Sequence, residues 1–145
     1  MDFMTAMRVS SSGMTAQRTR MNTISSNIAN VNTTRTPEGG PYRRKDAIFE
    51  AIPEQKTFGE ILIDKGDRNL HRVQVSDIDV DTKAPLLKYE PDHPDANEDG
   101  YVAYPNINLM EEMANMIQAT RSYEANISAF NSSKNMALDA IELGR

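Results

Sequence analysis

The stretch that decides the fold runs from Asn108 to Gly144 and reads NLMEEMANMIQATRSYEANISAFNSSKNMALDAIELG. It contains no proline, and its only glycine is the last residue. Asn108 is a favourable helix N-cap, and Glu111 three residues later completes the pattern of a capping box. Gly144 stands where a helix stop is expected. The stretch predicts one helix over residues 109–143, about 50 Å long at 1.5 Å per residue.

Apolar or small residues recur along this helix in steps of three and four, the spacing of one helix face. They are Met110, Met113, Ile117, Thr120, Ile127, Phe130, Ala137 or Leu138, and Ile141. Glu124 and Lys134 interrupt this apolar stripe. Glu111 and Glu112 are interpreted as first-turn carboxylates, which the positive end of the helix dipole favours.

A second helix is predicted at the start of the chain by apolar residues at heptad spacing. They are Met7, Met14, Met21 and Ile28, with Ile24 and Val31 in the second heptad position. Gly13 weakens this helix by about 1 kcal/mol relative to alanine. It either permits close approach of another helix or marks a loose N-terminal piece. The pattern ends at residues 30–32, where we expect an asparagine in the left-handed conformation to close the helix.

The middle of the chain is predicted to be extended and rich in loops. Tyr42–Ile52 and Phe58–Ile63 are short apolar runs bounded by proline and glycine. Val73 and Val75 alternate, but the next apolar residues, 78 and 80, have the opposite parity, so one continuous strand cannot bury both pairs. A bulge near Ser76–Asp77 would restore the register. The four prolines at 85, 91, 94 and 105 are expected to prevent regular structure before the last helix.

These patterns predict an α+β protein in which long N- and C-terminal helices form a coiled-coil-like domain. We assign residues 1–32 and 105–145 to this domain and residues 33–104 to a small β-rich region. The first helix is shorter than the second, so pairing them leaves part of the longer stripe bare. The pattern alone leaves two interpretations open. Either neighbouring molecules cover the bare stripe and build a filament, or the helices close on each other within a monomer.

Composition excludes several kinds of chemistry. The chain has no cysteine, which rules out disulfides, thiolate metal sites and a cysteine nucleophile. The alternating aspartates of residues 77–81 lack the glycine and glutamate of a calcium-binding loop. His71 and His93 are too isolated for a zinc site, and His93 is expected to be solvent-exposed. No nucleophile elbow occurs. We therefore predict a protein that is not an enzyme, with no cofactor, metal or small-molecule substrate.

Charge is unevenly distributed. Residues 1–45 carry seven basic and two acidic side chains, a net charge of +5, whereas residues 46–100 carry six and fourteen, a net charge of −8. A basic end and an acidic middle favour head-to-tail contact between copies. The basic run Arg43-Arg44-Lys45 is too short to indicate a nucleic-acid site. No run approaches the roughly 20 apolar residues that cross a bilayer, and no cleavable secretion signal is visible.

Residues at both ends resemble the flagellar rod and hook family. The motifs are Ser12-Gly13-Met14-Thr15-Ala16-Gln17 and Ser25-Ser26-Asn27-Ile28-Ala29-Asn30-Val31-Asn32-Thr33, which are similar to the family's N-terminal signature. Glu38–Arg43, Asp99–Asn108 and Arg121–Ile127 resemble its short proximal rod members, as does the ending Ala140–Gly144. The resemblance covers about the first 45 and the last 47 residues and is poor across residues 47–98.

The resemblance implies a structural subunit of the rod, the drive shaft that crosses the periplasm and passes torque from the membrane ring to the hook. It implies export, without a cleaved signal, through the flagellar type III apparatus. It also implies partners: further copies, the rod proteins FlgB, FlgF and FlgG, and the adapter FliE. The alternative is a small adapter or export-associated coiled-coil protein that binds a partner without forming a shaft.

Under the rod hypothesis, the terminal helices carry the assembly interface. The residues that we expect in it are Met7, Met14, Met21, Ile24, Asn27, Ile28, Asn30, Met113, Ile117, Arg121, Tyr123, Asn126, Ile127, Phe130 and Ile141.

Overall fold

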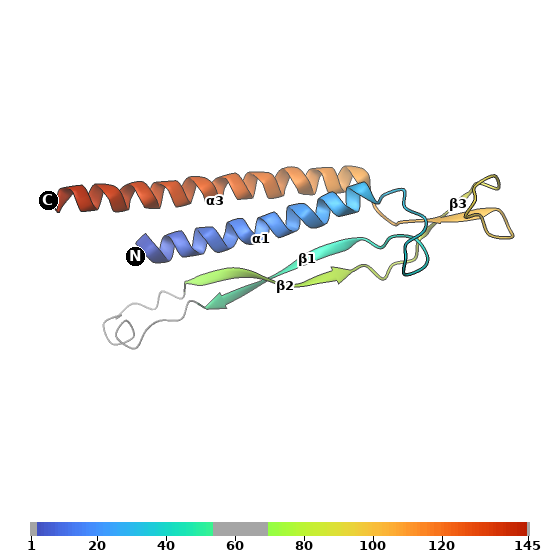
Figure 1. Ribbon diagram of the computed structural model, residues 1–145, viewed down its shortest axis with the longest axis horizontal. Helices are drawn as coiled ribbons and strands as arrows, with labels where there is room; N and C mark the ends of the chain where they lie inside the picture. Colours follow the sequence, from blue (N-terminus) through green and yellow to red (C-terminus); the bar gives the residue numbers. More distant parts are fainter. Residues whose placement is uncertain (1–2, 54–69, 145) are drawn as a thin grey trace.

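The fold is an elongated pair of helices with a two-stranded arm along one side and a hairpin at one end (Figure 1). A computed structural model describes residues 3–53 and 70–144 of the chain. The elements are α1 (Phe3–Ala29), β1 (Lys45–Pro53), β2 (His71–Val80), β3 (Leu86–Tyr89), β4 (Tyr101–Tyr104) and α3 (Leu109–Leu143). The α+β class predicted from the sequence is confirmed. The run Phe58–Ile63, which the sequence predicts as extended, lies outside the described residues.

The helices α1 and α3 lie side by side and antiparallel, so that both ends of the chain are at the same end of the molecule (Figure 1). The predicted bounds of α3 are confirmed. Asn108 caps it by accepting hydrogen bonds from the backbone N–H groups of Met110 and Glu111, and Gly144 is its C-cap. The helix α3 has 35 residues and α1 has 27, so the C-terminal end of α3 extends past the start of α1.

The end of α1 differs from the prediction. Among the described residues, no residue other than glycine has a positive φ angle, so no asparagine adopts the left-handed conformation. Instead, the side-chain amide of Asn30 donates to the carbonyl of Ser26 at 2.8 Å, and the Asn30 side-chain oxygen accepts from the Thr33 hydroxyl at 3.1 Å. The side chain of Asn30 thus closes the helix without a change in backbone handedness.

The strands β1 and β2 form an antiparallel arm beside α1. The predicted bulge is present: Ile48 is paired with Asp77, but Phe49 is paired with Val75, so Ser76 is the extra residue. The bulge places Val73, Val75, Ile78 and Val80 on one face, as the change in parity requires. The backbone N–H of Val73 donates to the hydroxyl of Ser12 in α1, which joins the arm to the helix pair.

A second antiparallel pair, β3 and β4, projects beyond the helix pair (Figure 1). The prediction that prolines prevent regular structure here is wrong, because the prolines flank these short strands rather than interrupt them. Gly100 has φ +78° and touches the Tyr89 ring, which packs edge-on against Tyr101 at 5.3 Å between centroids. His93 is also not simply exposed: its imidazole packs against the Tyr104 ring and accepts a hydrogen bond from the backbone N–H of Asp95.

Buried apolar side chains are few and scattered. In the described part of the chain they are Ala16, Ile24, Val102, Ile107 and Ala119. Since hydrophobic stabilisation scales with the apolar area removed from water, this core contributes little for a chain of 145 residues. Half-buried side chains between the helices and polar contacts add to this small core.

Candidate assembly interface

A buried polar junction holds the two helices, the arm and the connecting loop together at one end of the helix pair. Its centre is Asn27, which is 0% exposed. The Asn27 amide nitrogen donates to the Lys45 carbonyl at 2.8 Å and to a Glu112 carboxylate oxygen at 3.0 Å. The Asn27 side-chain oxygen accepts from the Lys45 backbone N–H at 2.9 Å and from the Tyr42 hydroxyl at 3.2 Å. Both N–H donors and both lone pairs of the amide are therefore used.

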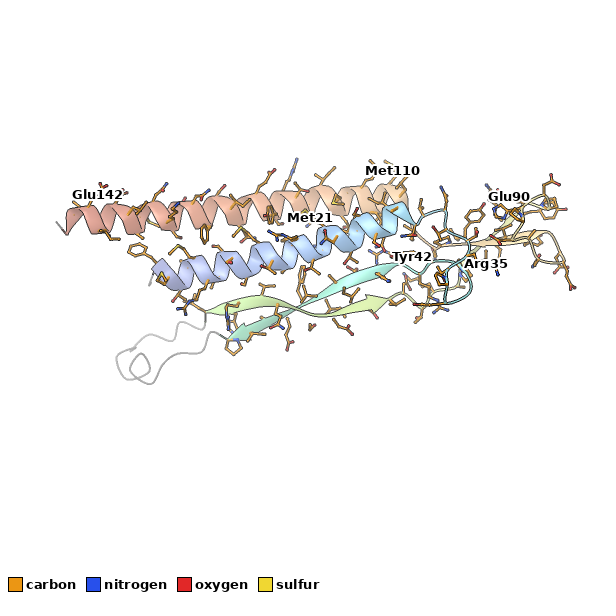
Figure 2. The ribbon with its side chains drawn as sticks, in the orientation of Figure 1. Met21, Arg35, Tyr42, Glu90, Met110 and Glu142 are labelled. Carbon is orange, nitrogen blue, oxygen red and sulfur yellow. The ribbon has the colours of Figure 1, made fainter. Side chains whose placement is uncertain are left out.

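The side chain of Asn27 forms hydrogen bonds with both the backbone N–H and the backbone carbonyl of Lys45. A neighbouring β-strand would pair with Lys45 through the same two groups. The last turn of α1 thereby fixes the position at which β1 begins. Figure 2 shows Tyr42 where the connecting loop reaches this junction. We expected Asn27 at an interface between molecules, but the structure places its side chain entirely inside one chain.

Glu112 is the second centre of the junction and is 1% exposed. One of its oxygens accepts from Asn27, and the other accepts from the Nε of Arg44 at 2.7 Å. Arg44 also reaches Asp46 at 3.3 Å. Burial alone would lower the pKa of Arg44, but the hydrogen bond and charge of Glu112 outweigh it and raise that pKa above its ordinary value. The Arg44 guanidinium thus supplies the opposite charge to a carboxylate that is removed from solvent.

The interpretation of Glu112 as a first-turn carboxylate that stabilises the helix through its dipole is therefore incomplete. Glu111, its neighbour, is exposed, whereas Glu112 points inward to Asn27 and Arg44. Sequence reasoning missed this site because the partners lie 85 and 68 residues away along the chain. The sequence signal for this site was the basic pair Arg43-Arg44. The sequence alone did not show which carboxylate would pair with either arginine.

The face of α3 that packs on α1 is a heptad seam in which one series of residues is small or polar and the other is mostly large and apolar. Its members are buried or half-buried and recur every seven residues in two series: Glu112, Ala119, Asn126 and Ser133, and Met116, Tyr123, Phe130 and Ala137. Three predicted interface residues, Tyr123, Asn126 and Phe130, therefore belong to the contact within the chain. We call this set the inner seam.

At Gly13, the Asn126 side chain of the inner seam lies close to the backbone of α1. A Cβ atom at this position would lie 2.9 Å from the side-chain oxygen of Asn126. The Asn126 amide nitrogen meanwhile donates to the carbonyl of Ser122 at 2.9 Å. Of the two interpretations that the sequence left open for Gly13, close approach of another helix is the one that the structure supports.

A second apolar line on α3 remains uncovered. Met110, Met113, Ile117, Leu138 and Ile141 are exposed by 74%, 49%, 56%, 50% and 67%. They lie about one residue, or roughly 100°, around the helix from the inner seam. In Figure 2, Met110 lies on the side of α3 that faces away from α1, whereas Met21 lies between the helices. We call this line, with Thr120, Glu124, Ile127, Asn131 and Lys134 between its ends, the outer stripe.

The predicted apolar stripe thus mixed two faces of α3. Phe130 and Ala137 belong to the inner seam, and the other predicted members belong to the outer stripe. Periodicity cannot separate them, because residues three, four or seven apart recur along both lines. Arg121 is exposed on a third, polar face of the same helix.

The predicted residues of α1 are mostly turned toward the rest of the chain. Ile24 is buried, and Met7, Met14, Met21 and Ile28 are half-buried. The sulfur of Met21 accepts a weak hydrogen bond from the Thr120 hydroxyl of α3 at 3.6 Å. Of the two helices, α3 therefore leaves more large apolar side chains exposed.

Residues 3–53 and 70–144 contain no candidate metal site and no candidate membrane span. No cluster of three or more histidine and acidic side chains there could hold a metal ion. In the same residues, no helix is long and apolar enough to cross a bilayer.

Paired terminal helices with an open apolar stripe on the longer one define an elongated subunit suited to assembly. Comparison with known proteins assigns the class. Residues 7–35 match the model of the flagella basal body rod protein family, and residues 98–143 match that of the flagellar basal body rod FlgEFG protein C-terminal region.

The chain belongs to the FlgC family of flagellar basal-body rod proteins. It is 46% identical to the flagellar basal-body rod protein FlgC of Borreliella burgdorferi, with 99% of this chain and 98% of the relative aligned. It is 42% identical to FlgC of Bacillus subtilis over 97% of both chains, and 37% identical to FlgC of Salmonella typhimurium over 94% of both. Its role is that of a structural rod subunit.

Proposed function

We propose that the chain builds the rod by burying the outer stripe of α3 in neighbouring subunits. The observation that carries this proposal is the exposure of large apolar side chains on the outer stripe toward both ends of α3, at Met110, Met113 and Ile117 and at Leu138 and Ile141. Soluble monomers rarely leave such a line open, and an exposed apolar surface of this extent is typical of a protein–protein contact.

Burial of this stripe contributes favourably to the free energy of assembly. Each Met, Ile or Leu side chain that becomes buried contributes about 1.5–3 kcal/mol before the costs of association. The C-terminal end of α3, with Leu138 and Ile141, extends past α1, so no second helix among the described residues covers it there. A stripe on one copy that contacts a different surface of the next copy makes a heterologous contact, which extends into a filament.

In the proposed role the chain is part of a drive shaft and catalyses no reaction. The shaft crosses the periplasm as part of the basal body and passes torque to the hook. Residues 1–32 and 105–145 form its core, and residues 33–104 face outward. The neighbours are further copies, the rod proteins FlgB, FlgF and FlgG, and the adapter FliE, after export through the flagellar type III apparatus.

A pair of adjacent substitutions tests the proposed interface. Ile117→Asp places a charge on the outer stripe, whereas Gln118→Asp places the same charge on the exposed polar face one residue later. We expect Ile117→Asp to abolish rod assembly and motility while export of the chain stays measurable. Bacteria that carry Gln118→Asp should swim normally. Ile127→Asp should behave as Ile117→Asp does. Normal motility in both isoleucine variants would rule out the outer stripe as the contact.

A further inference from the structure

Two opposite charges interrupt the outer stripe. Glu124 and Lys134 are both exposed and lie between the apolar residues Ile117 and Ile141. They are ten residues apart, or about 15 Å along the helix, so they cannot pair with each other. Within the described part of the chain, neither makes an ion pair.

Neighbouring residues of α3 do not neutralise them either. Lys134 has no carboxylate three or four residues away in either direction. Arg121 is three residues before Glu124, a spacing that permits a pair, yet the two side chains form none. Both charges are therefore available to another molecule that covers the stripe.

A covered but unpaired charge is strongly destabilising, so an opposite charge on the covering molecule favours the contact. The simplest source is a second copy, because the same stripe carries one charge of each sign. In coiled coils, charged and polar residues on an otherwise apolar seam select one register at some cost in stability.

We propose that Glu124 of one copy pairs with Lys134 of a parallel neighbouring copy and thereby sets the register between them. The pairing requires the two α3 helices to be offset by ten residues, about 15 Å. The same offset places Ile117 opposite Ile127, so the ion pair and an apolar pair form in one register. This inference rests on the proposed function, because it assigns the register of the same interface.

Charge exchange in a motile strain tests the pair. Glu124→Lys and Lys134→Glu each place like charges together, and each should lower the number of assembled rods roughly tenfold, the effect of about 1.4 kcal/mol. The double variant Glu124→Lys/Lys134→Glu should restore rods and motility. Asp139→Lys, a charge reversal on the exposed polar face, is the control and should assemble normally. A double variant no better than the worse single variant would overturn the proposal.

Disulfide mapping tests the direction and the offset, since the chain has no cysteine of its own. In cells that produce Ile117→Cys and Ile127→Cys chains together, oxidation of isolated basal bodies should link the two. An antiparallel pair held by the same charges would instead link Ile117→Cys to Ile141→Cys, and that result would overturn the parallel register. If these tests fail but Ile117→Asp still abolishes assembly, the proposed register is wrong and the proposed function of the outer stripe is retained.

Discussion

The amide of Asn27, near the end of α1, donates a 3.0 Å hydrogen bond to the carboxylate of Glu112, in the first turn of α3, across 85 residues of sequence. Both side chains are almost completely buried. This contact fixes where the two helices meet, and the bonds from Asn27 to Lys45 place the arm on the same point. A chain with few buried apolar residues is thus held at one end by a polar junction with all the hydrogen bonds of its central amide satisfied.

Replacing Asn27 tests the junction directly. Asn27→Ala leaves the Lys45 backbone and one Glu112 oxygen without partners in a buried site, so we expect a loss of about 2–4 kcal/mol of unfolding free energy. Asn27→Asp should cost at least as much, because it places a second carboxylate beside Glu112. Urea unfolding followed by circular dichroism measures both. The control is Asn22→Ala, which changes an exposed asparagine of the same helix. An equally large loss of unfolding free energy in that variant would contradict the stabilising role of the buried junction.

The ion pair between Arg44 and Glu112 is testable by a double-mutant cycle. Arg44→Met leaves the Glu112 carboxylate buried without its cation, and we expect it to cost roughly 2–4 kcal/mol, since the arginine itself is partly exposed. Arg44→Met/Glu112→Gln should be less destabilised than the sum of the single variants, because the double change removes the charge along with its partner. Additive losses in denaturant unfolding would show that the two side chains do not depend on each other.

Close approach at Gly13 predicts a compensating pair. Gly13→Leu must displace Asn126 and should destabilise the helix pair by about 1–3 kcal/mol. In Gly13→Ala/Asn126→Ala, the clash is absent and the glycine replacement gains up to about 1 kcal/mol of helix propensity. We therefore expect this double variant to unfold at or above the wild-type temperature. A double variant less stable than Gly13→Leu would mean that Asn126 is needed for more than space.

Acid should loosen the β3–β4 hairpin at Glu90. Hydrogen bonds from Lys88 and then from the Tyr104 hydroxyl lower the pKa of Glu90 below its ordinary value of 4.5. A depressed folded-state pKa means that the contribution of Glu90 is fully present above about pH 4.5 and is lost as the pH falls through the folded-state value. Amide chemical shifts of residues 86–104 report this loss during a pH titration.

Two comparisons make the pH prediction specific. The same hydrogen bond raises the pKa of Tyr104 above 10.0, so its contribution is present below that pH and is lost as the pH rises through the folded-state value. Glu90→Gln cannot ionise and should remove the acid-dependent part of the shift changes in the hairpin. An unchanged titration in that variant would assign the effect to another carboxylate of the loop.

The local features of the helices were predictable because they depend on neighbouring residues. Asn108 and Gly144 mark the ends of α3 through capping geometry, and the parity change at Ser76 requires a bulge whatever the partner strand is. Gly13 marked a possible close contact but not its partner, since Asn126 lies 113 residues later in the sequence and only helix packing brings the two together. The β3–β4 hairpin was missed because its four-residue strands are shorter than the spacing of the prolines around them.

By itself the sequence determined the helices and the bulge, because each follows from the periodicity of a single element; it left open whether the apolar helix surface is covered within one chain. Only the tertiary structure decided which line of α3 packs on α1 and which stays open. The two lines lie about 100° apart on one helix and share the same spacing of three and four residues, so the sequence pattern alone does not distinguish them. The tertiary structure also decided that Asn27, Arg44 and Glu112 hold the subunit together, since their contacts depend on three elements meeting in space.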